Sequence, residues 1–466
     1  MPRTLKKPSP RAAAAKRNVA SPSRELALDV LAEVRAGRFA EHALSERLEA
    51  TRIGSKDRAL ATELTYGVLR WRMRMDAIID RCLRKSRSKL RPHVRDILRI
   101  ALYQLIMLDR IPEHAAVNQA VMQARRRCDE RAAGFVNALL RNVIRTRESV
   151  DPRPSNDAES LSCYYSHPVW LVKRWLDELG LQATLAILAH NNSRSTLTVR
   201  VNSLKTTRED FMALLASHEI AAQPAHTQPN AVVISPGAGA VHELPGFHEG
   251  LFVVQECASQ MIAPLLRVQP GVRVLDACAA PGGKTAHLAA LGGNRILITA
   301  IDSDASRVEE TRRNLERLGV TCADVVQGDS TDASFVEGLG PFDAVLLDPP
   351  CSNLGVLRHN PEVKYRIGPD DPSTFARVQS NMVRATAGAL KPGGTLVYSV
   401  CTVTYEETVQ VVTDFLKEFP QFSAARIQPG EVGSPRLLDP TGFLTTFPPR
   451  AEEPLDGFFA ARTAKT

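Results

Sequence analysis

The stretch DACAAPGGKTAHL, residues 276–288, decides how we interpret the fold. It follows the strand-like run VRVLDA (272–277) and leads into a segment with helical character. Glycines permit a tight turn and a close backbone approach, and the start of a helix offers free N–H groups. A loop of this kind at the carboxyl end of a strand predicts a binding site for a nucleotide-like cofactor.

Two common nucleotide-binding motifs do not fit this stretch. The GxGxxG pattern of nicotinamide-dependent dehydrogenases is not satisfied. A phosphate-binding P-loop needs a glycine five residues before Gly283, and Cys278 stands there. The loop therefore indicates a different cofactor.

Strand-like and helical segments alternate on the carboxyl-terminal side of the loop. This alternation predicts a doubly wound, parallel α/β sheet, that is, a Rossmann-like domain over residues 244–463. The last two strand-like runs predict an antiparallel pair added to one edge. The expected strands are VRVLDA (272–277), ILITAI (296–301), DVVQ (324–327), DAVLLD (343–348), TLVYSV (395–400), FLTTF (443–447) and GFFAAR (457–462).

Two carboxylates follow the second and third strands of this sheet. Asp302 comes about twenty residues after the glycine loop, where an acid commonly accepts a hydrogen bond from a ribose hydroxyl. It could instead cap the next helix, but Asp304 is available for that. Asp329 could face an adenine edge or simply close a turn.

Two cysteines follow the fourth and fifth strands. Asp348-Pro349-Pro350-Cys351 ends one strand and Ser399-Val400-Cys401-Thr402 ends the next. In a doubly wound sheet both strand ends lie at the ligand-binding edge, so two thiols and the Asp348 carboxylate should converge beside the glycine loop.

This combination suits methylation of cytosine at C5. That carbon is too weakly nucleophilic to take a methyl group from a sulfonium until a thiolate adds to C6. A carboxylate near N3 and the exocyclic amine stabilises the altered ring, and a base must later remove the C5 proton. A lone cysteine at a strand end is more often a small buried hydrophobe, but two cysteines and a carboxylate at one edge favour chemistry.

The amino-terminal half has a different character. Residues 21–147 show helical spacing of apolar residues, with Ser21 as a candidate helix cap, and predict an all-α domain. Seven basic residues from Arg81 to Arg95 form either a solvated helical face and loop or a surface that faces RNA, and we favour the second because the rest of the chain needs an RNA partner. A linker-like stretch leads to residues 161–243, which predict a small α/β module for RNA recognition. Residues 1–20 predict a disordered basic tail.

Composition sets outer limits on the function. A net charge of +8 is compatible with a polyanionic partner. The eight cysteines contain no CxxC pair, which argues against a zinc site and against a disulfide framework. We therefore expect a cytoplasmic enzyme with free thiols, no bound metal and no membrane segment, and we expect a monomer.

Long motifs in the third region resemble the RNA 5-methylcytosine methyltransferases of the NOL1/NOP2/Sun family. The helical region resembles the NusB fold through segments such as ILRIALYQLIMLDRIPEHAAVNQAV (97–121) and GFVNALLRNVI (134–144). The family motifs are GLFVVQECASQM (250–261), LDACAAPGGKTAHLAAL (275–291), DAVLLDPPCSNLGVLRHNPEVKYR (343–366), LKPGGTLVYSVCTVTYEE (390–407) and DGFF (456–459).

The resemblance implies S-adenosylmethionine as methyl donor and 16S ribosomal RNA as acceptor. It makes Cys401 the nucleophile and gives Cys351 a part in product release. It places Asp348 beside the cytosine base, which its carboxylate stabilises. It assigns the methyl donor to Cys278, Ala279, Ala280, Pro281, Gly282, Gly283, Lys284, Asp302, Asp329 and Asp348. Many bacterial relatives have Asp-Ala-Pro-Cys where this chain has Asp-Pro-Pro-Cys, a change that keeps both the carboxylate and the thiol.

Three alternatives remain at this point. The substrate could be transfer RNA or another ribosomal site, which the residues do not distinguish. A non-catalytic RNA-binding adaptor would require a decayed glycine loop and a lost Cys401, and both are intact. An adenine amino-methyltransferase would need an aromatic residue after Asp-Pro-Pro, where Cys351 stands.

Overall fold

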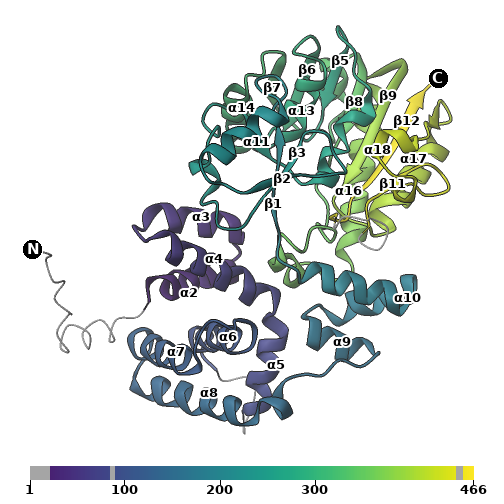
Figure 1. The fold of residues 1–466 in the computed structure, drawn as a ribbon. Helices are drawn as coiled ribbons and strands as arrows, with labels where there is room; N and C mark the ends of the chain where they lie inside the picture. The colour runs from purple at the N-terminus through teal and green to yellow at the C-terminus, as the bar shows by residue number, and fades with distance from the viewer. Residues whose placement is uncertain (1–20, 84–89, 448–454) are drawn as a thin grey trace, which may run out of the picture. The chain divides into compact units, whose positions relative to one another are not determined.

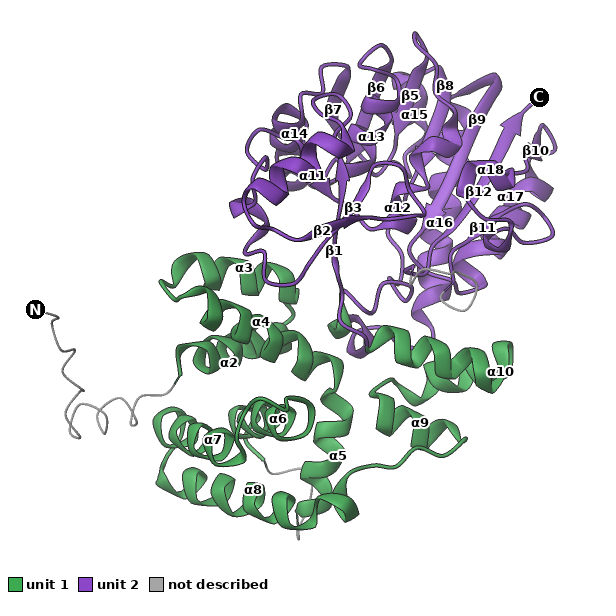
Figure 2. Cartoon of the chain, in the orientation of Figure 1, with its two compact units in different colours: residues 1–192, 360–362 green, residues 193–359, 363–466 purple. Residues whose placement is uncertain are grey.

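A computed structural model describes residues 21–83, 90–447 and 455–466. The chain forms two compact units (Figure 2). Unit 1 contains the described residues up to Asn192 together with Asn360–Glu362, and unit 2 contains Ser193–His359 and Val363–Thr466. The predicted tail, residues 1–20, lies outside the described residues.

Unit 1 is a bundle of helices (Figure 1). Its core joins residues from five of them, Leu28, Leu64, Ile78, Leu98 and Leu140, each at most 1% exposed. The prediction of an all-helical amino-terminal region is confirmed. The helices are α2 (Pro22–Arg35), α3 (Ala40–Ala50), α4 (Ser55–Arg70), α5 (Arg72–Cys82), α6 (Pro92–Met107), α7 (Glu113–Arg127), α8 (Glu130–Val150), α9 (Ala158–Tyr165) and α10 (Val169–Asn191).

The cap expected for the first helix is only partly as predicted. Ser21 is the residue before α2, but its side chain accepts no hydrogen bond from the helix. Its hydroxyl lies 2.8 Å from that of Ser23 instead. By contrast, Asp129 accepts from the N–H of Ala132 at the start of α8.

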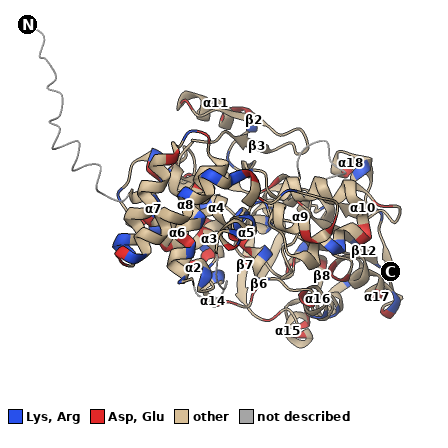
Figure 3. Cartoon of the chain, turned by 90° about the horizontal axis from the view of Figure 1, so that it is seen from below, with Lys and Arg blue, Asp and Glu red and all other residues tan. Residues whose placement is uncertain are grey.

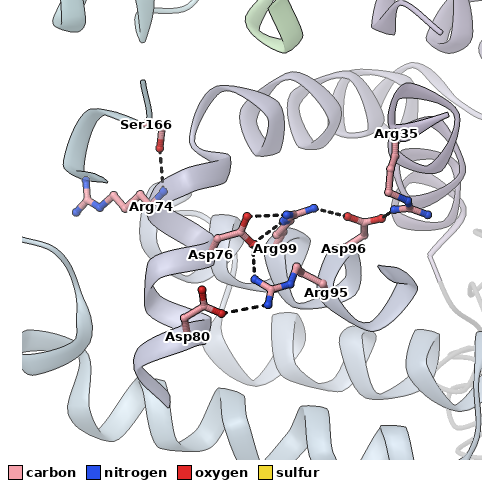
Figure 4. A network of polar contacts seen from close by, with 8 residues as sticks. All are labelled: Arg35, Arg74, Asp76, Asp80, Arg95, Asp96, Arg99 and Ser166. Carbon is pink, nitrogen blue, oxygen red and sulfur yellow. Dashed lines mark hydrogen bonds and ion pairs between the residues drawn. The ribbon is translucent and has the colours of Figure 1, made fainter. Parts of the chain in front are cut away.

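A chain of ion pairs crosses the interior of this bundle (Figure 4). Arg99 of α6 donates to Asp76 of α5 at 2.6 Å and to Asp96 at 2.7 Å. Asp96 also binds Arg35 of α2, and its side chain is only 3% exposed. The network therefore ties α2, α5 and α6 together through charges held largely out of water.

The described members of the basic run between residues 81 and 95 have partners within unit 1. Arg95 binds Asp76 and Asp80, Arg91 binds Asp129, and Arg81 donates to the carbonyl of Val150. Figure 3 likewise shows Lys and Arg beside Asp and Glu on the helices. The other members, Arg84, Lys85, Arg87 and Lys89, lie outside the described residues. The described arginines thus serve the fold, and an RNA-facing role for this run stays a prediction.

Unit 2 begins with a small antiparallel sheet in the order β2-β3-β1-β4. Phe211 of helix α11 packs under it against Phe252, with ring centroids 5.2 Å apart. The segment predicted as the middle module, 161–243, is divided here, because α9 and α10 belong to unit 1 and β4 lies beyond residue 243. The elements are β1 (Leu197–Val201), α11 (Arg208–Ser217), β2 (Ala222–Pro224), β3 (Ala231–Ile234) and β4 (Phe252–Val254).

The large sheet of unit 2 has the order β10-β12-β9-β8-β5-β6-β7, with β11 paired to β12. Strands β5 to β9 run parallel, and β12 joins antiparallel to β9, so the predicted doubly wound sheet and its added edge are confirmed. Strand β10 had no counterpart among the predicted strands. The strands are β5 (Arg273–Asp276), β6 (Leu297–Asp302), β7 (Ala323–Gln327), β8 (Phe342–Leu347), β9 (Leu390–Val400), β10 (Phe422–Ala424), β11 (Leu444–Thr445) and β12 (Phe459–Lys465).

Helices cover both faces of this sheet (Figure 1). Leu346 contributes to one apolar core while its neighbours Val345 and Leu347 contribute to the other. Such two-sided burial explains the continuous apolar runs in the sequence. The helices are α12 (Cys257–Gln260), α13 (Gly283–Leu291), α14 (Ala305–Leu318), α15 (Ala333–Leu339), α16 (Asp371–Gly388), α17 (Val411–Glu418) and α18 (Pro429–Val432).

The two sheets of unit 2 are joined by polar side chains that bind backbone carbonyls. Asn202 donates to the carbonyls of Gly250 and Leu318, and Lys205 donates to that of Arg317. Arg200, almost fully buried, donates to the carbonyl of Gly283 at the start of α13. The small sheet is thereby fixed to the end of α14 and to the glycine loop.

No helix among the residues described here is long and apolar enough to cross a membrane.

We predict that Asp96→Ala destabilises unit 1 by about 3 kcal/mol, because it leaves two arginines with a lost partner in a mostly buried network. The three tryptophans, Trp71, Trp170 and Trp175, all belong to unit 1. Urea denaturation of the whole chain, followed by tryptophan fluorescence, therefore measures this unit selectively.

The matched control is Arg91→Ala, which removes an ion pair whose two side chains are 56% and 47% exposed. It should cost at most ~1 kcal/mol, as surface pairs do. Equal urea midpoints for the two variants would contradict a structural role for the buried network.

Candidate active site at the carboxyl edge of the sheet

The glycine loop lies where predicted, between β5 and α13. The N–H of Ala279 donates to Ile301 of β6 at 2.8 Å, and the N–H of Ala277 donates to Leu346 of β8 at 2.9 Å. Asn314 of α14 donates to the carbonyl of Pro281. The loop is therefore held between the two strands that flank β5, where the strand order reverses and ligands bind in such sheets.

Gly282 and Gly283 serve different purposes in this loop. Gly282 has a φ of +93°, and a Cβ there would meet Thr311 and Leu315 at 3.2 and 3.3 Å, so only glycine fits. Gly283 begins α13, and a Cβ there would meet nothing within 4 Å. Because the first N–H groups of a helix have no acceptor within it, this open side can receive a polar ligand.

Asp276, the last residue of β5, is a buried carboxylate beneath the loop. One oxygen accepts from the hydroxyl of Thr285 at 2.7 Å, while Oδ1 is buried with no hydrogen-bond partner. Burial raises the pKa of Asp276 to about 6, with Thr285 and Lys284 opposing the rise. An unsatisfied buried oxygen at this place fits a site that a polar ligand completes.

The structure separates the two carboxylates after β6 as the sequence predicts. Asp304 caps α14 by accepting from the N–H groups of Ser306 and Arg307. Asp302 ends β6, is 6% exposed, and lies 3.4 Å from the guanidinium of Arg307. Arg307 also donates to the carbonyl of Ala280, so it links this carboxylate to the glycine loop.

Asp329 and Cys278 take part differently from the other candidates. Asp329 is exposed, and it accepts from the N–H and hydroxyl of Thr331 in its own turn. The thiol of Cys278 lies 3.9 Å from the sulfur of Met382, and burial raises its pKa well above the usual range. This placement favours a backbone role for Cys278 over a chemical one.

Asp348 follows β8 and joins the loop to the next strand. One oxygen accepts from Nζ of Lys284 at 2.6 Å and the other from the hydroxyl of Ser399 at 3.0 Å. Burial lowers the pKa of Lys284, but its attraction to Asp348 outweighs burial and the net shift is upward. The Asp348 carboxylate therefore favours the ammonium form of Lys284.

The two predicted cysteines meet beside this pair. Their sulfur atoms are 3.2 Å apart. Cys351 is 6% exposed, whereas Cys401 is half-buried. The hydrogen bond with Cys401 and then burial raise the pKa of Cys351 well above its ordinary value, so Cys351 stays a thiol. Cys401 interacts electrostatically with the Lys284 ammonium.

Glu407 holds the loops that carry the two cysteines. Its carboxylate accepts from the N–H and hydroxyl of Ser352, next to Cys351, and from the hydroxyl of Thr404, close after Cys401. Gln379 supplies a further N–H. Burial raises the pKa of Glu407, and these hydrogen bonds oppose the rise. The distance between the sulfur atoms thus depends on a fixed framework behind them.

Several residues of this edge were missed by sequence reasoning. Glu407, Ser399 and Asn353 lie within motifs already noted, but nothing in their spacing shows which side chains face the thiols. Arg307 is an exposed residue of α14, and its position in the sequence does not show that it contacts Asp302. A carboxylate seven residues after the end of β9 is the one signal that points to Glu407.

Among the described residues, no group of three or more His, Cys, Asp or Glu side chains could hold a metal ion.

Three protein-family models match successive parts of the chain. The model of the NusB family matches residues 21–145, and the model of the ferredoxin-like domain of RsmF/B-like methyltransferases matches 167–240. The model described as 16S rRNA methyltransferase RsmB/F matches 263–464.

Curated relatives match nearly the whole chain. A protein of Vibrio cholerae, "Ribosomal RNA small subunit methyltransferase B", is 36% identical over 91% of this chain and 94% of its own length. A protein of Synechocystis, "Probable ribosomal RNA small subunit methyltransferase B", is 33% identical over 95% and 99%.

Solved structures agree with the fold. The crystal structure of PH0851 superposes with a TM-score of 0.81 at 26% identity, over 96% of this chain and all of that one. NSun6 from Pyrococcus horikoshii, solved with SFG, has a TM-score of 0.56 at 22% identity, over 64% of this chain and 98% of its own. At this identity the likeness shows a shared fold only.

The doubly wound sheet, its glycine loop and these matches define the chain as a Rossmann-like methyltransferase. More particularly, it belongs to the RsmB/F family of 16S rRNA methyltransferases, and the resemblance seen in its motifs is confirmed.

We predict that Asp276→Asn stabilises the protein at pH 7.5 by ~3 kcal/mol, the worth of a pKa raised from 3.8 to about 6. An acid with a raised folded-state pKa contributes most stability below its unfolded pKa and loses it as the pH rises through about 6. The gain should therefore vanish near pH 4. Calorimetric unfolding at a series of pH values measures it.

Asp304→Ala is the control with the opposite sign. Hydrogen bonds from Ser306 and then Arg307 lower the pKa of Asp304, so its contribution is present at neutral pH and is lost in acid. A destabilised Asp276→Asn variant at pH 7.5 would show that the buried carboxylate supports the fold instead of straining it.

Proposed function

We propose that this protein methylates C5 of a cytosine in 16S ribosomal RNA, with S-adenosylmethionine as methyl donor. The observation that carries the proposal is the pair of sulfur atoms 3.2 Å apart at the ends of β8 and β9, beside the Asp348 carboxylate. The names of the curated relatives support the small-subunit RNA as substrate.

Cys401 is the better placed of the two thiols to form a bond with the base. It is more exposed than Cys351, and the Lys284 ammonium attracts its negative charge. The Cys401 thiolate adds to C6 of the cytosine, forming a C–S bond and moving the electrons of the C5–C6 double bond toward the ring nitrogen and carbonyl. C5 then becomes nucleophilic enough to accept a methyl group.

Asp348 stabilises the ring while it carries the added charge. Its carboxylate is anchored by Lys284 and Ser399, so it is oriented before the base arrives. When protonated at N3 or at the amine, the ring donates toward this carboxylate.

Cys351 suits the final step. It remains a thiol by virtue of the Cys401 contact and burial, which raise its pKa. After methyl transfer a base takes the C5 proton, the C6–S bond breaks, and the Cys401 thiolate is regenerated. Because the two sulfur atoms are 3.2 Å apart, the Cys351 thiol can donate a hydrogen bond to the Cys401 thiolate as it leaves C6, which stabilises the leaving group.

The residues at the glycine loop fit S-adenosylmethionine. The unsatisfied Oδ1 of Asp276, the open start of α13 at Gly283 and the buried Asp302 offer polar groups for its amino acid and ribose parts. When bound, the donor supplies a methyl group on a positively charged sulfonium. We assign its binding to the loop Cys278–Lys284, Asp302 and Asp348, with Asp329 at the rim.

The acceptor base has to leave its stack before Cys401 can reach C6, because both faces of C5–C6 are covered within a duplex. A single-stranded or unfolded region of the RNA is therefore the preferred substrate. The helical unit and the small sheet would hold RNA phosphates and shape. Free thiols and an RNA substrate favour the cytoplasm, and we propose that the protein acts as a monomer.

We predict that Cys401→Ala lowers methyl transfer by at least ~10³-fold, because the covalent step is lost, while donor binding stays nearly unchanged. Cys351→Ala should still bond to RNA but release it slowly, giving an adduct that survives denaturing electrophoresis. Labelled methyl transfer and gel shift measure the two effects.

Cys322→Ala is the matched control, since Cys322 lies just before β7, at the edge of the sheet four strand positions from β9. It should keep wild-type turnover and form no lasting adduct. Normal turnover in Cys401→Ala would overturn the covalent mechanism.

The site of modification can be mapped directly. Bisulfite sequencing can compare total RNA from cells with and without the gene. RNA from cells without the gene should lack one 5-methylcytosine in 16S ribosomal RNA and should keep all of those in transfer RNA. A loss confined to transfer RNA would overturn the proposed substrate but leave the chemistry standing.

A further inference from the structure

The side chain of Asn353 lies against both cysteines. Its Oδ1 accepts a hydrogen bond from the Cys401 thiol at 2.8 Å and lies 3.6 Å from the sulfur of Cys351. Asn353 is half-buried, two residues after Cys351. A single carboxamide thus contacts the two sulfur atoms that are 3.2 Å apart.

The backbone around Asn353 fixes where this carboxamide can be. Its φ is +58°, a left-handed conformation that asparagine and glycine adopt more readily than other residues. Just beyond it, the N–H of Gly355 donates to the carbonyl of Cys401, and the N–H of Gly457 donates to the carbonyl of Gly355. A Cβ at Gly355 would come within 1.8 Å of the Gly457 carbonyl oxygen, so the loop has no room to shift.

We propose that Asn353 orients the sulfur of Cys401 and keeps it in hydrogen-bonded contact in both of its charge states. A carboxamide has an acceptor and two donors on one planar group. Its oxygen accepts from the thiol, as observed, and after the proton has passed to solvent its N–H group can donate to the thiolate. A thiol needs an acceptor and a thiolate needs a donor, and the carboxamide of Asn353 offers both without carrying a charge.

The charged groups around the cysteines explain why it matters that the contact from Asn353 is neutral. Lys284 attracts a thiolate at Cys401, Asp348 is neutralised by that lysine, and Glu407 acts on Cys351 from behind. A carboxylate in place of the Asn353 amide would add a negative charge at hydrogen-bond distance from Cys401 and could only accept. The proposal rests on the proposed function for its catalytic consequence, but the contact itself can be measured without RNA.

Two substitutions that suit a left-handed residue test the proposal. Asn353→Asp preserves shape and adds the negative charge, and Asn353→Gly preserves the backbone and deletes the carboxamide. Alkylation of Cys401 by monobromobimane, followed by peptide mass spectrometry across pH 5–10, reports on its thiolate. Thermal unfolding confirms that each variant is folded.

Asn353→Asp should move the pH of half-maximal alkylation of Cys401 upward by at least one unit, so that labelling at pH 7 slows about tenfold or more. Asn353→Gly should move it much less, yet lower kcat for methyl transfer about tenfold with the KM for S-adenosylmethionine unchanged, the loss expected for one hydrogen bond to the reacting atom. Asn294→Asp is the matched control, because Asn294 also has a positive φ, +56°, and lies just before β6, at the amino-terminal edge of the parallel sheet and opposite the cysteines.

Alkylation curves within 0.3 pH units of each other in wild type and Asn353→Asp would overturn the proposal, as would full kcat in Asn353→Gly. The alkylation assay and the methyl-transfer assay also distinguish a failure of this proposal from a failure of the proposed function. If Cys401→Ala retained methyl transfer while Asn353→Asp still displaced alkylation, the covalent mechanism would fail and the contact of Asn353 with Cys401 would stand.

Discussion

The ion pair between Lys284 and Asp348 is the interaction on which the carboxyl edge of the large sheet depends. It joins the glycine loop after β5 to the segment after β8, and Ser399 extends the link to β9. Three strand ends that are far apart in sequence are thereby held in one arrangement. Since both charges are mostly withdrawn from water, losing either would leave the other poorly solvated. The pair therefore couples the place where a methyl donor would bind to the place where the thiols meet.

Much of the fold could be predicted from the sequence because its signals are local. The parallel strands are short apolar runs followed by turn residues, and the runs predicted at 324–327 and 343–348 agree with β7 and β8 to within one residue at each end. Strand β10 was missed because three residues carry too little pattern, and β4 because its sheet partner β1 is distant in sequence. The residues that converge at the edge were predicted from topology, since parallel strands end together. Which side chains touch there was beyond that reasoning: the contacts of Asn353, Glu407 and Arg307 depend on loop conformations that no periodicity encodes.

The cysteines show how environment separates two residues of the same type. Topology placed both at one edge, and the family resemblance alone gave them unequal roles. Their surroundings now supply a physical reason. Cys351 is buried and its pKa is raised, whereas Cys401 is more exposed and interacts electrostatically with the Lys284 ammonium. Behind the two cysteines, the Glu407 carboxylate accepts hydrogen bonds from Ser352 and Thr404. These bonds hold the two cysteine loops at a fixed separation.

The contact between Gly355 and Gly457 has a bearing on how the enzyme is made. The cysteine loop is supported by a segment that is synthesised about a hundred residues later, and β12 then enters the sheet between β9 and β10. On the ribosome, unit 1 and strands β5 to β9 leave the exit tunnel before that support exists. The nascent chain can thus present the folded helical unit while the carboxyl edge of the large sheet is still incomplete, and this edge is complete only once the last strand has been added.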